Sequence, residues 1–168
     1  MSLKKINIEE LKFNPFEKIG KQWMLLTAGN KESWNTMTAS WGQLGVLWNK
    51  NVLTCYIRTS RHTLGFVEDN DTFTASFFGE EMRSALAFCG AHSGRDCDKA
   101  KETGLVPEEI DGTVTFAQSE LVLVCKKLYT YDIEKNGFFD KKLNDAFYTG
   151  DAYHRTFIAE IVSAYIKE

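Results

Sequence analysis

The chain is constrained most by a succession of β-prone segments between which helical patterns are few and irregularly placed. Apolar, β-branched or alternating runs cover residues 22–28, 34–41, 52–57, 72–78, 113–131 and 157–166. The run 113–131 is long enough for two strands or one bent strand. A parallel doubly wound sheet would need regular alternation of strands and helices, which is missing here. The pattern therefore predicts a mainly β chain, a closed or half-closed antiparallel barrel with short helices inserted between strands.

Three short helices are predicted between these strands. The first covers 63–69 with Thr63 as its cap, and the second covers 80–89 and stops at Gly90. Ser93 to Asp96 fits a capping box that opens the third helix, which Gly104 ends.

Size and charge limit the classes of protein that remain. The 168 residues suit a single domain, 1–168, and the net charge is −3. No basic stripe is present, so we expect no nucleic-acid partner. No apolar stretch is long enough to span a bilayer, and Met1 to Lys5 does not lead into an apolar signal core. These features predict a cytoplasmic protein without a membrane partner.

The four cysteines lie far apart, which favours free thiols in a reducing compartment. Cys55 and Cys125 stand in apolar runs and are predicted core residues. Cys89, His92 and Cys97 offer zinc ligands, but their spacing matches no common zinc finger and a fourth ligand is missing. A tight loop and a capped helix are the preferred interpretation, with Arg95, Asp98 and Lys99 either paired with each other or facing a ligand.

The segment from Asn35 to Gly42 is the first candidate site. Alternation places one set of side chains on one face and a second set on the other: Thr36, Thr38 and Ser40, against Met37, Ala39 and Trp41. Taken alone, this pattern is typical of an edge strand with a polar solvent face. A following glycine-containing loop, 42–45, allows close approach of backbone to a ligand, which favours a surface for a flat ring.

The segment from Arg58 to Thr63 is the second candidate site. Arg58 and Arg61 would repel each other unless an anion lay between them, and Ser60 and Thr63 add hydroxyl donors. The start of the helix near Thr63 adds a positive dipole end. The alternative is a basic surface turn that caps this helix; phosphate binding is the preferred interpretation.

His154, just before the last strand, has two interpretations. It is either a strand-end residue with a satisfied hydrogen bond or a contact to a cofactor or reducing partner. Several other chemistries lack their motifs. The sequence has no dinucleotide-binding glycine fingerprint, no phosphate-binding P-loop and no Gly-x-Ser-x-Gly elbow, which argues against a Rossmann site, a nucleotide hydrolase and a serine hydrolase.

Taken in order, these segments resemble the flavin reductase-like family, whose members have an FMN-binding split β-barrel. The resemblance covers about residues 23–161. The segments that carry it are Asn35–Trp41 with Gly45 and Trp48, Arg58–Thr63, Phe73–Phe78, Ser93–Lys99, and Tyr153–His154 with Ile158–Ile161. One departure is Asn51, where many relatives carry proline.

The resemblance implies non-covalently bound FMN in a homodimer whose interface helps to form the site. It also implies a set of cofactor-binding residues: Asn35, Thr36, Met37, Thr38, Ala39, Ser40 and Trp41 around the ring, Arg58, Ser60, Arg61, His62 and Thr63 around the phosphate, and Ser93, Gly94, Lys99 and His154 at the sides.

Two functions follow from the resemblance. The first is an NAD(P)H:flavin oxidoreductase, in which NADH or NADPH donates a hydride to bound flavin. The second is a flavoredoxin-like electron-transfer protein, reduced by an electron-carrier protein instead of a nicotinamide nucleotide. A flavin storage module without turnover is a third, weaker interpretation. No catalytic residue is assigned, since hydride or electron transfer takes place at the cofactor ring.

Overall fold

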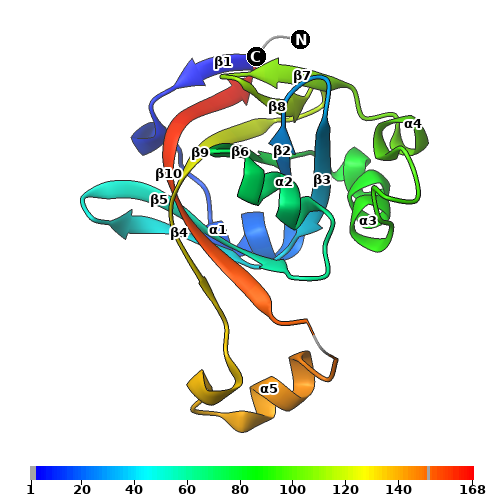
Figure 1. Ribbon diagram of the computed structural model, residues 1–168. Helices are drawn as coiled ribbons and strands as arrows, with labels where there is room; N and C mark the ends of the chain where they lie inside the picture. Colours follow the sequence, from blue (N-terminus) through cyan, green and yellow to red (C-terminus); the bar gives the residue numbers. More distant parts are fainter. Residues whose placement is uncertain (1–2, 151) are drawn as a thin grey trace.

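The computed structural model describes residues 3–150 and 152–168; Met1, Ser2 and Asp151 lie outside the described residues. Its main element within these ranges is an eight-stranded antiparallel sheet with the order β3-β2-β6-β9-β10-β5-β4, in which β1 also pairs with β10 (Figure 1). The strands of this sheet are β1 Leu3–Ile6, β2 Met24–Gly29, β3 Trp34–Ala39, β4 Gly42–Leu47, β5 Lys50–Arg58, β6 Thr72–Phe77, β9 Leu121–Asp132 and β10 His154–Lys167. A separate hairpin joins β7 Pro107–Ile110 to β8 Thr113–Phe116. The predicted antiparallel barrel is confirmed, and the run 113–131 forms two strands.

The sheet curls because its two edge strands are neighbours in sequence. β3 ends at Ala39 and β4 begins at Gly42, yet these strands stand at opposite ends of the strand order. Only Ser40 and Trp41 connect them, so the edges of the sheet must come together at this point. We call this place the seam of the barrel. The predicted loop 42–45 is wrong, since these residues belong to β4, where a side chain at Gly42 would lie 2.9 Å from the Thr54 carbonyl oxygen.

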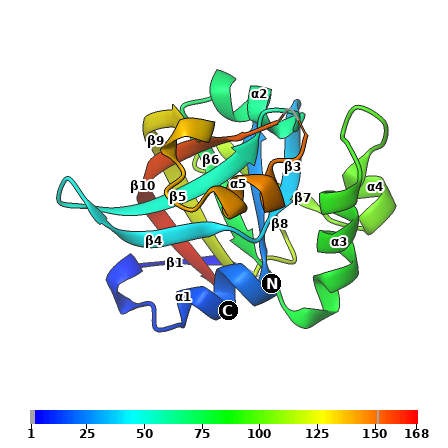
Figure 2. The same ribbon diagram turned by 90° about the horizontal axis from the view of Figure 1, so that it is seen from below.

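β10 has different neighbours along its length. Its first half pairs with β5 and its last residues pair with β1, and two irregularities in its pairing with β9 bend it between Ile158 and Ser163. Beyond the barrel, β9 and β10 continue as a two-stranded ribbon that carries helix α5, Lys141–Phe147 (Figure 1). This part, residues 133–150 with 152 and 153, is called the α5 lobe. It hangs below one barrel end in Figure 1 and overlies that end in Figure 2.

The helices between strands are short, and several predicted boundaries change. The elements are α1 Pro15–Glu17, a π-helical turn Lys18–Gln22, α2 Thr63–Asp69, α3 Arg83–Ala91, α4 Lys99–Thr103 and single 3-10 turns at Ile8–Glu10, Glu80–Met82 and Lys135–Gly137. Thr63 is not the cap of α2, because His62 holds that position and the Thr63 hydroxyl accepts a hydrogen bond from Asn35 Nδ2 at 2.8 Å.

Two further helix boundaries differ from the prediction. Gly90 lies inside α3, which ends one residue later. The capping box at Ser93 is wrong: Asp98 caps α4 by accepting a hydrogen bond from the Lys101 amide. Gly104 ends α4 in the left-handed region, with φ +73°, as predicted.

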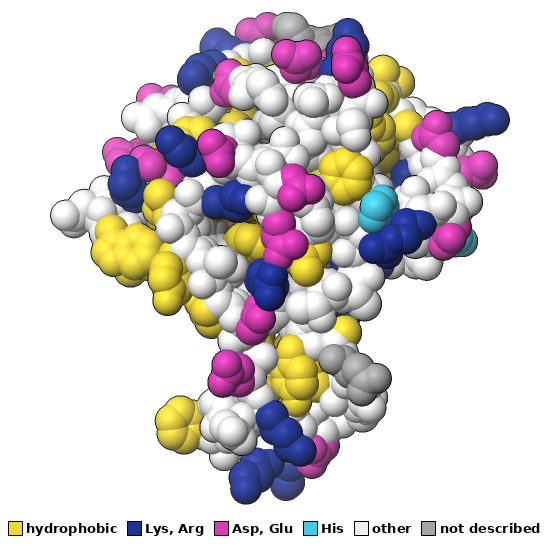
Figure 3. All heavy atoms as spheres, in the orientation of Figure 1, with side chains coloured by type: hydrophobic (Ala, Val, Ile, Leu, Met, Phe, Trp, Pro, Cys, Tyr) yellow, Lys and Arg dark blue, Asp and Glu magenta, His cyan; other side chains and the backbone are white. Residues whose placement is uncertain are grey.

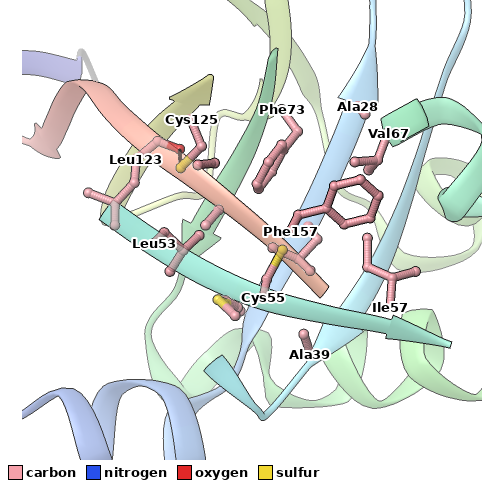
Figure 4. Packing of buried hydrophobic residues seen from close by; sticks show 14 of the residues in the cluster. Ala28, Ala39, Leu53, Cys55, Ile57, Val67, Phe73, Leu123, Cys125 and Phe157 are labelled. Atoms are coloured by element: carbon pink, nitrogen blue, oxygen red, sulfur yellow. Dashed lines mark hydrogen bonds between the residues drawn. The ribbon is translucent and has the colours of Figure 1, made fainter. Parts of the chain in front are cut away.

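The main hydrophobic core fills the barrel (Figure 4). Phe73, Leu53 and Leu123 come from three different strands and are fully buried. Cys55 and Cys125 are also fully buried, and burial raises the pKa of Cys55 to about 12, which confirms both as core residues. A second cluster packs α3 against the outside of the sheet through Leu86, Leu25 and other residues. None of the helices among the described residues is long and apolar enough to cross a membrane.

Candidate cofactor site at the barrel seam

Two adjoining cavities lie beside the seam. The larger, of about 350 Å³, is called the Lys99 cavity and is lined by Asn35, Met37, Arg58, Ser60, Arg61, His62, Thr63, Ala91, His92, Ser93, Gly94 and Lys99. The smaller, of about 220 Å³, is called the His154 cavity and is lined by Met37, Thr38, Ala39, Ser40, Trp41, Tyr56, Arg58, Arg61 and His154. Met37, Arg58 and Arg61 line both, so the two hollows form one continuous site.

The structure brings together every predicted site residue except Thr36. That side chain is fully buried, and its hydroxyl shares hydrogen bonds with Thr27 Oγ1 at 2.8 Å and the Leu26 carbonyl at 3.2 Å. The polar side chain of Thr36 therefore stabilises the interior of the sheet. The Thr38 hydroxyl donates to the Leu86 carbonyl, so this side chain packs against α3, while it stays half-buried and lines the His154 cavity.

Strand pairing explains why segments distant in sequence meet here. His154 starts β10 directly opposite Arg58, the last residue of β5. The Thr59 amide then donates to the Tyr153 carbonyl at 3.0 Å, which extends this pairing into the loop before α2. Because β3 ends at the same barrel end, the loops after β3 and β5 and the start of β10 surround one opening.

The Lys99 cavity is positively charged. The Lys99 side chain is only 5% exposed, and its Nζ donates to the carbonyls of Thr36 at 2.7 Å and Cys89 at 2.9 Å. Arg61 Nη1 donates to the Gly90 carbonyl at 2.6 Å. Burial is the main cause that lowers the pKa of both Lys99 and Arg61, and the charge of Arg58 lowers that of Arg61 further. No acidic residue lines this cavity in the described part of the chain, so a bound anion would offset the crowded positive charge.

The hydrogen bonds of Lys99 decide whether it pairs with its neighbour Asp98, which the sequence left open. It does not pair with Asp98; it bridges β3 and α3 through two carbonyls at the cavity wall. Gly94 closes another part of the wall, since a Cβ there would lie 2.0 Å from Asn35 Oδ1. The loop before α4 therefore needs glycine at this position to lie against Asn35.

Arg58 has a second role that the sequence does not indicate. Its Nη1 donates to the Ala152 carbonyl at 3.0 Å and its Nη2 to the Phe147 carbonyl at 2.9 Å. The guanidinium also lies 5.3 Å from the centre of the Tyr148 ring. Arg58 therefore fastens the α5 lobe to the barrel, and Arg61 with Lys99 offers the cationic surface that remains for an anion.

Replacing Arg58 with alanine is expected to release the α5 lobe. The change removes two charge-assisted hydrogen bonds and a cation–π contact at once, each worth roughly 0.5–3 kcal/mol. Limited proteolysis should then cut within residues 133–150 several times faster than in the unmodified protein. Arg95→Ala, which removes an exposed arginine that lines neither cavity, is the matched control. Equal cleavage rates for the two variants would contradict this assignment.

The His154 cavity is bounded by aromatic rings. The Trp41 ring centre lies 5.2 Å from that of His154 and 5.4 Å from that of Phe147 on the lobe. Tyr56, which sequence reasoning missed, lines the same cavity and donates its hydroxyl hydrogen to Gln43 Oε1 at 2.9 Å. Its position two residues before Arg58 on one strand places both side chains on the same face, and this spacing was an available signal.

His154 has the satisfied hydrogen bond of the first interpretation, and it also lines the cavity where the cofactor contact of the second interpretation would be made. It is 7% exposed and lines the cavity, and its Nδ1 is joined to the Tyr148 hydroxyl at 2.8 Å. Burial, followed by the charges of Arg58 and Arg61, lowers the pKa of His154 from 6.5 to about 4. The imidazole is therefore neutral at physiological pH.

A third hollow of about 530 Å³, called the Phe16 cavity, adjoins the His154 cavity through Ser40, Trp41 and Tyr56. Its remaining lining comes from two helical turns, β4 and the lobe stem: Pro15, Phe16, Ile19, Gly20, Gly42, Gln43, Leu44 and Ile133. None of these residues is charged. No local pattern in the sequence predicts this cavity, because its walls meet only in the folded chain.

Taken together, the site offers a cationic pocket for an anion, an aromatic pocket for a flat ring and an uncharged opening beside it. The family model described as the flavin reductase like domain matches residues 16–168 of the chain, so the chain belongs to this family. No curated protein sequence matches the chain.

Solved structures show the same fold at low sequence identity. A flavin reductases-like FMN-binding domain from Shewanella baltica OS155 is 19% identical with a TM-score of 0.69, covering 98% of this chain and 77% of that chain. Flavoredoxin from Methanosarcina acetivorans is 22% identical with a TM-score of 0.68, covering 95% and 76%. The styrene monooxygenase flavin reductase from Pseudomonas putida S12 is 15% identical with a TM-score of 0.64, covering 88% and 80%. The split-barrel fold is thus shared.

Proposed function

We propose that this protein binds FMN at the seam and acts as an NAD(P)H:flavin oxidoreductase. One observation carries the proposal: the cationic Lys99 cavity and the aromatic His154 cavity share Met37, Arg58 and Arg61. A phosphorylated, flat molecule fits that arrangement, because it needs a cationic pocket next to a flat slot. The family and the names of its structural neighbours point to the same cofactor.

The chain supplies each part of such a site. Arg61 and Lys99, with the hydroxyls of Ser60 and Thr63, would hold the phosphate. The strand end Met37 to Trp41 would lie along the ring, together with Tyr56. Bound FMN supplies hydride or electron transfer. The residues position it, and no acid–base pair is required.

The Phe16 cavity provides the approach for the electron donor. It opens at Trp41 and Tyr56, and its uncharged walls suit a neutral ring such as nicotinamide. The structural similarity to the styrene monooxygenase flavin reductase from Pseudomonas putida S12 supports this choice of reaction class.

A flavoredoxin-like electron carrier is the second candidate. The observation that favours it is the same uncharged lining, because the Phe16 cavity offers no cation to the phosphates of a nicotinamide nucleotide. The likeness to flavoredoxin from Methanosarcina acetivorans supports it as well. An electron-carrier protein would then be the reductant.

Anaerobic reduction separates these candidates. The protein is reconstituted with FMN and mixed in a stopped-flow instrument with NADH and, separately, with NADPH. We expect the flavin absorbance to bleach within seconds with at least one of them. Bleaching by dithionite or a small ferredoxin, but by neither nucleotide, would favour the electron carrier. A protein that neither acquires flavin absorbance nor quenches added FMN fluorescence would contradict both.

We also propose that the protein forms a homodimer. Large apolar side chains are exposed on the β4–β5 hairpin and on the ribbon and lobe, where hydrophobic side chains are visible in Figure 3; they are Val46, Trp48, Tyr129, Tyr131, Phe139 and Leu143. Exposed apolar side chains that gather on neighbouring elements mark surfaces that a second subunit covers. Analytical ultracentrifugation should show a dimer at micromolar concentration, and a monomer alone would contradict the proposal.

A further inference from the structure

A hydrogen bond between the α5 lobe and the barrel ends on the imidazole at the His154 cavity. Tyr148 Oη lies 2.8 Å from His154 Nδ1, and the two rings meet edge to face with centres 5.5 Å apart. Tyr148 follows α5, whereas His154 is the first residue of β10. This bond therefore couples the lobe to a residue of the proposed flavin site.

The Tyr148 ring is fixed in place from several sides. Tyr153 stacks on it with ring centres 4.6 Å apart and planes 11° from parallel. The Arg58 guanidinium lies 5.3 Å from its centre, and the Phe138 ring lies 5.8 Å away. A phenol held this firmly offers its hydroxyl to one direction, and that direction is His154.

The direction of this bond depends on the tautomer of His154, and the partners available to the phenol favour one direction. Among the described residues, the Tyr148 hydroxyl has no hydrogen-bond partner besides His154 Nδ1. If the phenol accepted from Nδ1–H, its own hydrogen would have no acceptor among the described residues, so the arrangement that pairs both groups within the protein is the one in which the phenol donates to Nδ1. In that arrangement the single N–H of the neutral imidazole is on Nε2. No described residue forms a hydrogen bond with Nε2, and His154 lines the cavity.

The charges around His154 favour its neutral form. Burial and the positive charges of Arg58 and Arg61 lower the pKa of His154 to about 4. Of the other titratable groups that face it, Tyr56 lies with its ring centre 6.5 Å away, and burial raises its pKa. His154 at neutral pH is thus an uncharged donor and not a cation.

We propose that Tyr148 is a positioning residue: it holds His154 in the Nε2–H tautomer, so that Nε2–H donates a hydrogen bond to an acceptor atom of the ring bound beside Trp41. The ligand half of this inference rests on the proposed function, because it takes the ring to be a flavin. The tautomer half concerns the protein alone. A flavin ring carries several nitrogen and carbonyl acceptors along its polar edge, and a ring without such an acceptor would leave Nε2–H unpaired.

The test compares Tyr148→Phe with Tyr153→Phe. Both changes remove one phenolic oxygen from the same stacked pair, but the Tyr153 hydroxyl donates to Asn144 Oδ1 at 2.6 Å and not to His154. In the protein without flavin at pH 7, the ¹⁵N chemical shifts of His154 report which nitrogen carries the hydrogen. We expect the ratio of the Nε2–H to the Nδ1–H tautomer to fall about fivefold in Tyr148→Phe and to stay unchanged in Tyr153→Phe.

FMN titrations complete the experiment. Tyr148→Phe should bind FMN about fivefold more weakly, and Tyr153→Phe within twofold of the unmodified protein. An unchanged tautomer ratio in Tyr148→Phe would overturn the positioning role. A changed ratio with unchanged FMN affinity would overturn the donor role of Nε2–H. If the unmodified protein does not bind FMN, the proposed function fails, while the tautomer ratio still decides the role of Tyr148.

Discussion

Replacing Arg61 with alanine is expected to weaken FMN binding by roughly ten- to hundredfold, because a charge-assisted hydrogen bond to phosphate contributes about 1.5–3 kcal/mol. Arg61 lines both cavities and bonds to one carbonyl, that of Gly90, through one of its nitrogens. Arg58 is instead bonded to two carbonyls of the α5 lobe. Arg61 is therefore the arginine with more hydrogen-bond donors left for a phosphate.

Riboflavin distinguishes a phosphate contact from general damage to the site. It has the same ring but no phosphate, so Arg61→Ala should change its affinity by less than threefold, since no charge-assisted bond is lost. Fluorescence quenching measures both affinities under one set of conditions. Arg95→Ala, an exposed arginine that lines neither cavity, controls for the loss of one positive charge. Equal losses for FMN and riboflavin would show that Arg61 does not contact the phosphate.

Strand periodicity predicted the barrel because it depends on local pattern and burial. Polar and apolar residues alternate over 72–77, and nearly all of β6 is buried between β2 and β9. Helix ends were harder, because their caps compete with contacts across the fold. Thr63 is a residue type that often caps helices, but its hydroxyl accepts a hydrogen bond from the side chain of Asn35 on β3. Gly90 remains helical, and a Cβ there would come within 3.3 Å of the Thr38 side chain, so packing against β3 also favours glycine.

The site was predictable where its residues follow strand ends and not where distant segments meet. Residues at the ends of β3 and β5 lie together because the sheet closes at the seam. In contrast, nothing local to Arg58 indicates that it bonds to the carbonyls of Phe147 and Ala152. The role proposed for Tyr148 has the same origin, since it depends on how the ribbon of β9 and β10 folds back over the barrel end.

Lowering the pH is expected to destabilise the flavin-free protein through His154. The pKa of His154 is about 4 in the folded protein and near 6.5 when the chain is unfolded. Between these values the unfolded chain binds a proton that the folded protein does not bind, so stability falls as the pH decreases. His154 therefore contributes fully above about pH 6.5, and its contribution is lost on approaching pH 4. Between pH 7.5 and pH 4.5 the expected loss is roughly 2–3 kcal/mol.

Variants isolate this contribution from that of other titrating groups. Urea unfolding at pH 7.5 and pH 4.5 gives the free energy of unfolding for the unmodified protein, His154→Asn and His92→Asn. Asparagine at 154 retains hydrogen-bonding capacity but does not titrate, so this variant should lose roughly 2–3 kcal/mol less on acidification than the unmodified protein. His92 is exposed and lines the Lys99 cavity. Its replacement also removes one histidine but leaves the buried His154 in place, so it is the matched control. If His154→Asn and the unmodified protein lose stability equally, His154 is not held neutral by burial and the two arginines.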